Sequence, residues 1–530
     1  MSNHTAALAR SAKSTLSILV ALALAAPKVS AAANIEAAEQ LFRSGQYEKC
    51  ARLAAAQIDQ RVYIEKWVAW KVQAELAAGD YEAALRTVQQ GVDESPFNVA
   101  LRMLAYEALL YNGQTASAQA ELDRLERLVI ANPRRFTRPD ERVWLGKLFL
   151  LKGADARQVL ELFYDPVVKQ WPNFAAAPLA SAELALDKGD NGLAAEMLAS
   201  APDSASADPI FHYLVARAYS NDDPERASAS LDRALELNPR HIKSLLLRVD
   251  GCVDAEQYSD ADELLERVLE VNPRHPIAWA YKAVLSHLGN DQESEDEARR
   301  QALSTWTQNP AVDFTIGRKL SEKYRFAEGA AYQRRALKLD RVFLPARMQL
   351  SQDLLRLGDE DEGWRIVRNV FESDGYNVIA HNLVTLHDDL KSYRVLEDGM
   401  FRLRMESREA SLYGEQALAL LKRARSTLCE KYDVSLNEPI TVEIFPQQKD
   451  FAVRTFGMPG VQGYLGVCFG NVITANSPAA LGDASANWEA VLWHEFCHVA
   501  TLKKTRNKMP RWLSEGISVY EELQENGTWG

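Results

Sequence analysis

The tetrapeptides GQYE at Gly45–Glu48 and GDYE at Gly79–Glu82 share one pattern. The interval from Gly45 to Gly79 is the same as that from Gly79 to Gly113. A second tetrapeptide, NPRH, occurs at Asn238–His241 and again at Asn272–His275, with this same spacing. A period of about 34 residues predicts a chain of helix–turn–helix units, each of which buries its apolar face by stacking on its neighbours.

This period resembles the tetratricopeptide repeats, and the resemblance covers the chain from about Asn34 to Ser392. It implies a superhelical solenoid whose concave groove binds a protein partner. We expect roughly nine to eleven repeats, some of them degenerate. The regular spacing is lost over Ile130–Asp165, where the sequence NPRRFTRP predicts a longer connection.

Near the end of the chain, HEFCH at His494–His498 is followed by WLSEG at Trp512–Gly516. Two histidines four residues apart lie on one face of a helix, and that spacing suits two bonds to a single zinc ion. Glu495 lies about 100° round the helix, so that it can reach a metal-bound water without replacing it. Glu515 offers a third ligand, and three protein ligands leave a fourth position free, as in catalytic zinc sites. The alternative is two ordinary histidines on an amphipathic helix.

HEFCH followed by WLSEGISVYEE resembles the gluzincin branch of metallopeptidases, the peptidase MA group. The resemblance implies Zn²⁺ bound by His494, His498 and Glu515, and Glu495 as the general base of peptide-bond hydrolysis. It assigns residues 405–530 to an α+β, zincin-like domain. No GxMEN-like segment is present to bind a substrate amino terminus, which argues against a plain aminopeptidase. The chain has no room after the third ligand for the tyrosine that these enzymes supply, so we expect either a fragment of a longer protein or a cleft closed by an upstream repeat.

The sequence before the motif predicts both helices and strands. ALALLKRARSTLCEKY at Ala417–Tyr432 has helical periodicity, and ITVEIF at Ile440–Phe445 alternates as a strand does. The glycine-rich segment Gly460–Ile473 predicts a hairpin and an edge strand. By the resemblance, this edge strand pairs with extended substrate; the equally weighted alternative is a hairpin that only packs on the HEFCH helix. Asn487 is the expected N-cap of that helix, and a second helix is expected over Trp512–Leu523.

The amino terminus has the pattern of a signal peptide. Arg10 and Lys13 precede the apolar run Leu16–Ala26, and VSA at Val29–Ala31 offers a cleavage site with small residues. We therefore expect residues 1–31 to be removed and the protein to be periplasmic or secreted. An uncleaved signal anchor is the alternative. No later segment is long and apolar enough to span a membrane, so no transmembrane segment is expected after cleavage.

Charge and cysteine content exclude some classes of function. The net charge of −12 argues against nonspecific binding of nucleic acid. The 5 cysteines are scattered and lack CxxC spacing, so they predict no disulfide framework, although one bridge such as Cys429–Cys468 stays open. Cys497 lies within HEFCH and is interpreted as a packing residue, because a fourth protein ligand would close the catalytic position.

The sequence thus predicts a mainly α fold, in which a repeat solenoid over residues 34–392 precedes the α+β, zincin-like domain. The predicted function is that of an exported zinc metallopeptidase whose repeats recruit protein substrates or partner proteins. The alternative, of another class, is an exported repeat scaffold for protein–protein interaction whose peptidase domain is incomplete or inactive.

Overall fold

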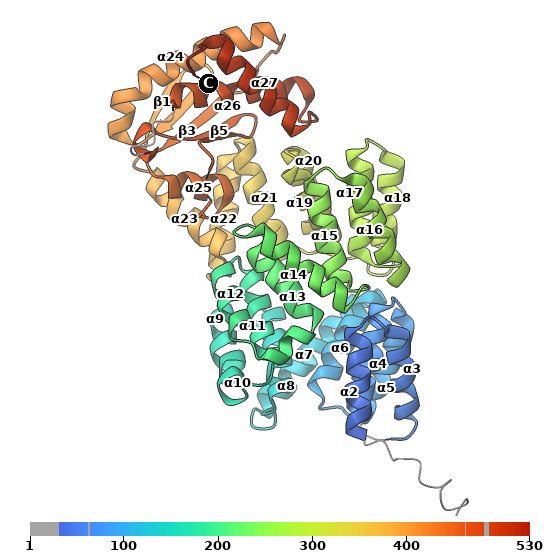
Figure 1. The fold of residues 1–530 in the computed structure, drawn as a ribbon. Helices are drawn as coiled ribbons and strands as arrows, with labels where there is room; N and C mark the ends of the chain where they lie inside the picture. Colours follow the sequence, from blue (N-terminus) through green and yellow to red (C-terminus); the bar gives the residue numbers. More distant parts are fainter. Residues whose placement is uncertain (1–30, 62–63, 462, 482–486, 530) are drawn as a thin grey trace, which may run out of the picture.

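A computed structural model describes residues 31–61, 64–461, 463–481 and 487–529 of the chain. The predicted signal segment, Leu16–Ala26, lies outside these residues. Figure 1 shows a long helical body that begins at α2 and carries a smaller lobe, with the C-terminus, at the opposite end.

Consecutive helices from Ala31 to Leu390 pack against one another in sequence, so the predicted repeat solenoid is confirmed. Its first helices are α2 (Ala31–Arg43), α3 (Tyr47–Ile58), α4 (Ile64–Ala77), α5 (Tyr81–Glu94), α6 (Val99–Tyr111), α7 (Thr115–Ala131), α8 (Pro139–Leu151), α9 (Ala156–Val159), α10 (Asp165–Gln170), α11 (Ala176–Asp187) and α12 (Asn191–Ala199). The following helices are α13 (Pro209–Tyr219), α14 (Pro224–Leu237), α15 (Ile242–Asp254), α16 (Tyr258–Val271), α17 (Pro276–Leu288), α18 (Gln292–Ala302), α19 (Pro310–Glu322), α20 (Phe326–Leu339), α21 (Leu344–Leu357), α22 (Glu360–Ser373) and α23 (Val378–Leu390).

Apolar residues at helical spacing explain why the pairs stack. In α5 the buried residues Tyr81, Ala84, Leu85 and Val88 recur at i, i+3, i+4 and i+7, which places them on one face. The turn between the two helices of a pair is tight, and Gly79 adopts a φ of +80° there, which suits a residue without a Cβ. The repeated glycine therefore marks the turn within each pair.

The stretch where the period fails, Ile130–Asp165, is an irregular repeat. After α8, the short helix α9 continues into a π-helical segment, η1 (Leu160–Tyr164), and then into α10. The side chain of Tyr164 in η1 is buried in the core that α8 and α11 form. A change of helix type therefore replaces the regular turn at the position where the sequence predicted a longer connection.

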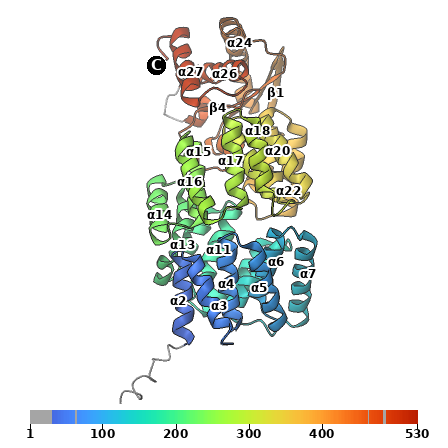
Figure 2. The same cartoon turned by 90° about the vertical axis from the view of Figure 1, so that its right-hand side faces the viewer.

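The two repeated tetrapeptides contact each other across the superhelix. The guanidinium of Arg240 binds both carboxylate oxygens of Glu48 at 2.8 and 2.7 Å, and Asn238 donates to the hydroxyl of Tyr47 at 3.2 Å. These partners are about 190 residues apart in the chain. Contacts between the turn that precedes α15 and the first repeats therefore join segments that are far apart in sequence, and Figure 2 shows α15 and α16 above α2.

The second copy of each tetrapeptide repeats this contact one period later. Arg274 binds Glu82 at 2.7 and 2.8 Å, and Asn272 donates to the hydroxyl of Tyr81 at 3.0 Å. We call the two contacts together the clasp. From one contact of the clasp to the other, the glycine motif and the NPRH motif both move along the chain by the same period. Repeats that are a fixed number of periods apart therefore contact each other across the superhelix.

The C-terminal lobe contains a five-stranded mixed sheet in the order β1-β2-β3-β5-β4. Its strands are β1 (Arg394–Asp398), β2 (Phe401–Met405), β3 (Ile440–Phe445), β4 (Gly466–Cys468) and β5 (Val472–Asn476), and its helices are α24 (Ser407–Lys431), α25 (Gln448–Phe456), α26 (Trp488–Thr505) and α27 (Arg511–Glu525). β2, β3 and β5 run parallel, whereas β1 and β4 are antiparallel edges. The predicted strand Ile440–Phe445 and the predicted hairpin are confirmed, and β4 is an edge strand. The sheet begins at Arg394, before the predicted lobe boundary at residue 405, because β1 and β2 form a hairpin that the sequence analysis did not predict.

The lobe is seated on the last helices of the solenoid through a shared core. Phe445 and Phe469 from the lobe pack in one cluster with Phe326 and Leu383 from the solenoid. The opposite face of the sheet packs against α24 and α26 in a separate core. The sheet is therefore covered on one face by its own helices and on the other by α25 and the solenoid, as Figure 1 shows.

Buried ion pairs reinforce this junction. Arg404 binds Glu360 of α22 at 2.7 Å and Glu443 of β3 at 2.6 Å, and Arg454 of α25 binds Glu443 at 2.6 Å. Breaking one partner of such a buried set leaves an uncompensated charge, which typically costs about 3–5 kcal/mol. Within the described part of the chain, no helix combines the length and apolarity needed to cross a membrane.

Candidate metal centre

Helix α26 positions the two histidines of HEFCH. The side chain of Asn487 caps the helix by accepting hydrogen bonds from the backbone N–H groups of Glu489 and Ala490, at 3.1 and 3.3 Å, so the expected N-cap is confirmed. Four residues make slightly more than one helical turn, so His494 and His498 lie one above the other on the same face. That face is turned toward α27.

Helix α27 brings Glu515 to the two imidazoles. The Nε2 atoms of His494 and His498 lie 3.1 Å apart, and the Oε2 atom of Glu515 lies 3.1 Å from the first and 3.4 Å from the second. Ligand atoms at about 2.0–2.1 Å from a tetrahedral zinc ion lie roughly 3.3–3.4 Å from each other. The three donor atoms therefore have the mutual spacing that one zinc ion requires, and their chemistry fits zinc.

The other nitrogen of each histidine has its own partner. The Nδ1 atom of His494 contacts Glu522, which lies about two helical turns beyond Glu515, and the Nδ1 atom of His498 lies 2.8 Å from the hydroxyl of Ser514. In the tautomer that leaves both Nε2 atoms free, each Nδ1–H donates to its partner. Such partners fix the orientation and tautomer of metal-binding histidines.

Glu495 lies between α26 and the edge strand β4. Its side chain is buried, and burial raises the pKa of its carboxyl group to about 7. A Cβ atom on Gly466 would lie 2.9 Å from the Oε1 atom of Glu495, so the close approach of strand and carboxylate requires glycine at this position. The absence of a side chain at Gly466 leaves room for this carboxylate beside the cluster of His494, His498 and Glu515.

The imidazole and carboxyl groups of the cluster shift one another's pKa values. Burial lowers the pKa of His494, but hydrogen bonds with Glu515 and Glu522 outweigh it and raise that pKa to about 10. Hydrogen bonds from His494 and His498 in turn lower the pKa of Glu515. The two acidic side chains thus surround the imidazoles with negative charge, as a cation site requires.

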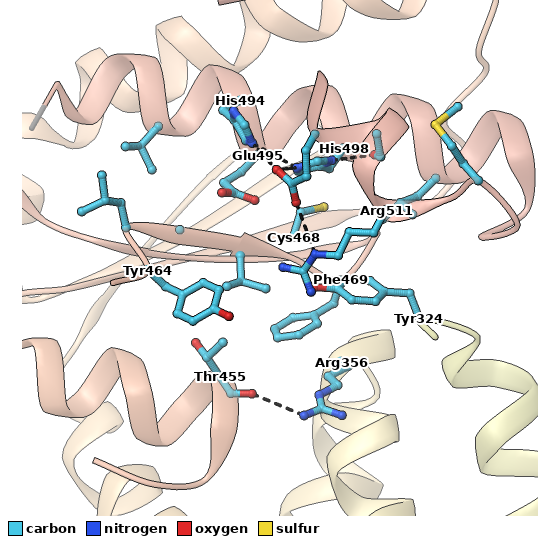
Figure 3. Close-up of a pocket in the computed structure, with 18 of the residues that line it drawn as sticks. Tyr324, Arg356, Thr455, Tyr464, Cys468, Phe469, His494, Glu495, His498 and Arg511 are labelled. Carbon is cyan, nitrogen blue, oxygen red and sulfur yellow. Dashed lines mark hydrogen bonds and ion pairs between the residues drawn. The ribbon is translucent and has the colours of Figure 1, made fainter. Parts of the chain in front are cut away.

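A cavity of about 1070 Å³ opens in front of the cluster. One wall is formed by α26 and α27, and a second by β4 and the segment before it, including Tyr464. The third wall comes from the solenoid, which contributes Tyr324 and Arg356 among other residues. Figure 3 shows these side chains on the side of the cavity opposite His494 and Glu495. The sequence analysis offered an upstream repeat as one way to close the cleft, and the structure places solenoid residues there.

Tyr324 is a cavity residue that the sequence analysis did not single out. It lies at the turn between α19 and α20, and Asn507 from the loop between α26 and α27 donates to its carbonyl oxygen at 2.8 Å. The guanidinium of Arg511 lies 5.5 Å from the centre of its ring. Burial raises the pKa of its phenol to about 12, so the hydroxyl keeps its proton at neutral pH.

A signal in the sequence could have found Tyr324. It stands one repeat period after Asn290 and one before Gly358, at the turn position that glycine occupies in the first repeats. Its φ is +63°, which a bulky residue rarely adopts. The period alone therefore makes visible an aromatic residue at a turn position that glycine occupies in other repeats.

A second acidic group, two members of which line the same cavity, has its charges satisfied. Asp250, Asp254 and Glu322 lie close enough to hold a cation. Lys319 binds Asp254 at 2.6 Å and Glu322 at 2.5 Å, and Arg318 binds Asp250 at 2.6 Å. Protein cations therefore already pair with all three carboxylates of this group.

All five cysteines are free thiols. The disulfide between Cys429 and Cys468, which the sequence analysis left undecided, is therefore not formed. Cys497 is fully buried in the core between the sheet and its helices. This agrees with its interpretation as a packing residue.

No protein-family model matches the chain, and no curated protein matches it. Among solved structures it is similar to yeast Tom70, with 12% sequence identity and a TM-score of 0.33, over 76% of this chain and 99% of that one. It is also similar to the APC/C hetero-tetramer Cut9–Hcn1, with 11% identity and a TM-score of 0.30, over 66% of this chain and 89% of that one. At these TM-scores neither likeness bears on the chemistry of the site.

Proposed function

We propose that this protein is a zinc-dependent peptidase whose active-site cleft is completed by a tetratricopeptide-like solenoid. The observation that carries the proposal is the spacing of three donor atoms, from His494, His498 and Glu515, at 3.1, 3.1 and 3.4 Å. Two of them come from α26 and one from α27, so only the folded lobe brings them together. The gluzincin resemblance of HEFCH and WLSEG points to the same ligands.

The chemistry follows from the groups around the cluster. Zinc bound there would polarise the carbonyl of the scissile bond and make a water molecule more acidic. Glu495, buried beside the cluster, would accept the proton of the attacking water and pass it to the leaving amine.

Tyr324 is our candidate for the group that stabilises the developing charge on the carbonyl oxygen. It lines the cavity with Glu495, and among the described residues its hydroxyl makes no hydrogen bond. A preorganised donor of this kind typically contributes about 10²–10³ to the rate. The solenoid would in this way supply one group of the active site.

An extended peptide is the substrate that the cleft favours. β4 pairs only with β5 among the described strands, so its outer backbone groups are available for another strand. Tyr464 and Leu465, immediately before β4, are 39% and 40% exposed. A peptide that adds to this edge would place its backbone along the wall that carries Glu495.

Metal content and hydrolysis test the proposal together. Purified wild-type protein should hold about one zinc ion per chain and cleave members of an unstructured peptide library. Glu495→Gln should keep the zinc and lose cleavage by at least about 10²-fold, while Glu489→Gln, exposed on the same helix, should match the wild type. Elemental analysis and mass spectrometry of the peptides give both readouts. Unchanged zinc content in a His494→Ala, His498→Ala double variant would refute the metal site.

A repeat scaffold without catalysis is the second candidate. The observation that favours it is the solenoid, which makes up most of the described chain and offers an extended surface to a protein partner. Under this candidate, Glu495→Gln would leave the biological effect intact while changes in the solenoid would abolish it. For both candidates the apolar run Leu16–Ala26 supports our proposal that the protein is exported, which amino-terminal sequencing of the mature protein tests.

A further inference from the structure

Arg356 is a cation of the cleft that has no acidic partner in the described chain. It lies near the end of α21 and lines the same cavity as His494 and Glu495. Its one hydrogen bond runs to the carbonyl oxygen of Thr455, at 3.4 Å. Within the residues that the structure describes, its guanidinium forms no ion pair with a carboxylate.

The other arginines around the cleft and the junction are paired. Arg511 lies 3.5 Å from Glu515, Arg404 binds Glu360 and Glu443, and Arg454 binds Glu443. A guanidinium that is withdrawn from water without a partner is costly, so proteins ordinarily pair it. Arg356 departs from the rule that its neighbours follow.

The surroundings of Arg356 hold its guanidinium in place. It lies 5.4 Å from the ring centre of Phe326 on the solenoid side and 5.4 Å from that of Phe469 on the lobe side. Asp353, the acidic residue nearest in sequence on α21, is fully buried, and burial raises its pKa to about 7, so it offsets the charge only in part. Apolar walls also strengthen the interaction with any anion that reaches the guanidinium.

We propose that Arg356 is a carboxylate-binding subsite of the cleft. A guanidinium presents a planar pair of N–H donors that matches a carboxylate. In a peptide substrate the carboxylate is that of an Asp or Glu side chain or of the C-terminus, and both present the same chemistry. This inference rests on the proposed peptidase function, because it assigns the substrate class of that same cleft.

Binding of matched peptides to the full-length chain tests the subsite. The probes are fluorescently labelled peptides of one apolar sequence, in which a single Glu or Gln is moved along the chain and the end is either a free carboxylate or an amide. Fluorescence anisotropy with the Glu495→Gln protein measures affinity without cleavage. We expect one placement of Glu, or the free C-terminus, to bind on the order of 10–100-fold more tightly than its neutral counterpart. Which pair shows the difference tells a side-chain carboxylate from a terminal one.

Variants of α21 show whether Arg356 is responsible. Arg356→Gln should abolish the preference and leave the affinity for neutral peptides unchanged, and Arg356→Lys should restore part of it. Arg347→Gln is the matched control: Arg347 lies on the same helix, also binds only a carbonyl oxygen, and lies outside this cavity. Equal affinities across the peptide pairs, an unchanged preference in Arg356→Gln, or no binding of any peptide would overturn the subsite. If the wild-type protein cleaves no peptide but the preference for a carboxylate is observed, the peptidase proposal is refuted and the anion site stands.

Discussion

At the turn between α19 and α20, Tyr324 combines an unfavourable backbone with a position in the cleft. Glu256, Asn290 and Gly358 occupy the same turn in neighbouring repeats, and all have positive φ values. Only at residue 324 does a large aromatic side chain take this conformation, which costs about 1–2 kcal/mol relative to glycine. Strained residues of this kind cluster at functional sites, and Tyr324 lies on the wall opposite Glu495.

Tyr324→Phe tests this use directly. The ring keeps its contacts with Phe326 and Phe469, so zinc content and melting temperature should stay near those of the wild type. Peptide cleavage should fall by roughly 10–10³-fold in kcat, because a donor to the carbonyl oxygen is lost. Tyr258→Phe, which alters an exposed tyrosine of the solenoid, is the control. Full activity in Tyr324→Phe would assign the stabilising role elsewhere.

Asp353 makes stability depend on pH. Burial raises the pKa of its folded-state carboxyl to about 7, whereas an aspartate in an unfolded chain titrates near pH 4. Between these values the folded state holds a proton that the unfolded state has lost, so the free energy of unfolding falls as pH rises through this window. We expect Asp353→Asn to melt at a higher temperature than the wild type at pH 8, with a smaller difference at pH 5.

Calorimetry of both proteins at the two pH values measures this effect, which amounts to a few kcal/mol at most, at about 1.4 kcal/mol per unit of pKa. The exposed Asp59→Asn variant serves as control, because its side chain has no burial to relieve. If the difference in melting temperature between Asp353→Asn and the wild type became smaller from pH 5 to pH 8, the raised pKa of Asp353 would be contradicted.

At the scale of elements, the clasp turns two local motifs into a long-range contact. Gly-x-Tyr-Glu and Asn-Pro-Arg-His each predict a turn by themselves, but neither shows that the other is its partner. The clasp also explains why a glycine stands at position 79, more fully than the turn conformation does. A Cβ on Gly79 would lie 2.4 Å from the Oδ1 atom of Asn272, so the residue must lack a side chain for the repeats to approach.

Gly79→Ala and Gly153→Ala separate these two reasons. Both glycines have φ near +80°, but a Cβ on Gly153 meets nothing within 4 Å. Each alanine should lower the free energy of unfolding by about 1–2 kcal/mol, because a residue with a Cβ is strained in the left-handed backbone conformation. Gly79→Ala should cost more, because it also pushes Asn272 out of the clasp, and its solenoid should widen in solution X-ray scattering. Equal losses of melting temperature in the two variants would show that the clasp does not stabilise the superhelix.

At the scale of the whole molecule, the solenoid covers one of the two faces of the sheet in the lobe. One face of its sheet packs against α24 and α26, while Phe445, Phe451 and Phe469 pack among solenoid side chains. A fragment of residues 394–530 would expose this second face to water, at a cost of about 25 cal/mol for each Å² of apolar surface. We expect that fragment to be unstable and prone to aggregate.

A longer fragment that starts at residue 310 keeps α19 to α23 and should fold, bind zinc and retain the cleft wall with Tyr324 and Arg356. Circular dichroism on heating and elemental analysis of both fragments measure the difference. A cooperative transition in residues 394–530 at the melting temperature of the longer fragment would show that the lobe is independent. Adding a chelator to the full chain should leave the helical signal of the solenoid unchanged, since its repeats stack without metal.

The sequence by itself determined the repeat, several elements of the lobe and the residues of the candidate metal centre. The period of the repeats, the alternation in β3 and the spacing of His494 and His498 are local features, and local features follow from helix and strand geometry alone. Even the helix cap at Asn487 depends on backbone groups only two or three residues away.

Only the tertiary structure decided how these parts meet. The contacts between Glu48 and Arg240, and between the cavity wall at Tyr324 and the cluster at Glu495, join residues about 170–190 positions apart, and no periodicity encodes such a pairing. They follow from the pitch at which the repeats stack, which is set by packing summed over many helix pairs. The cleft is therefore a product of the last solenoid helices and the lobe together, because the core that they share brings α20 and α21 to the sheet.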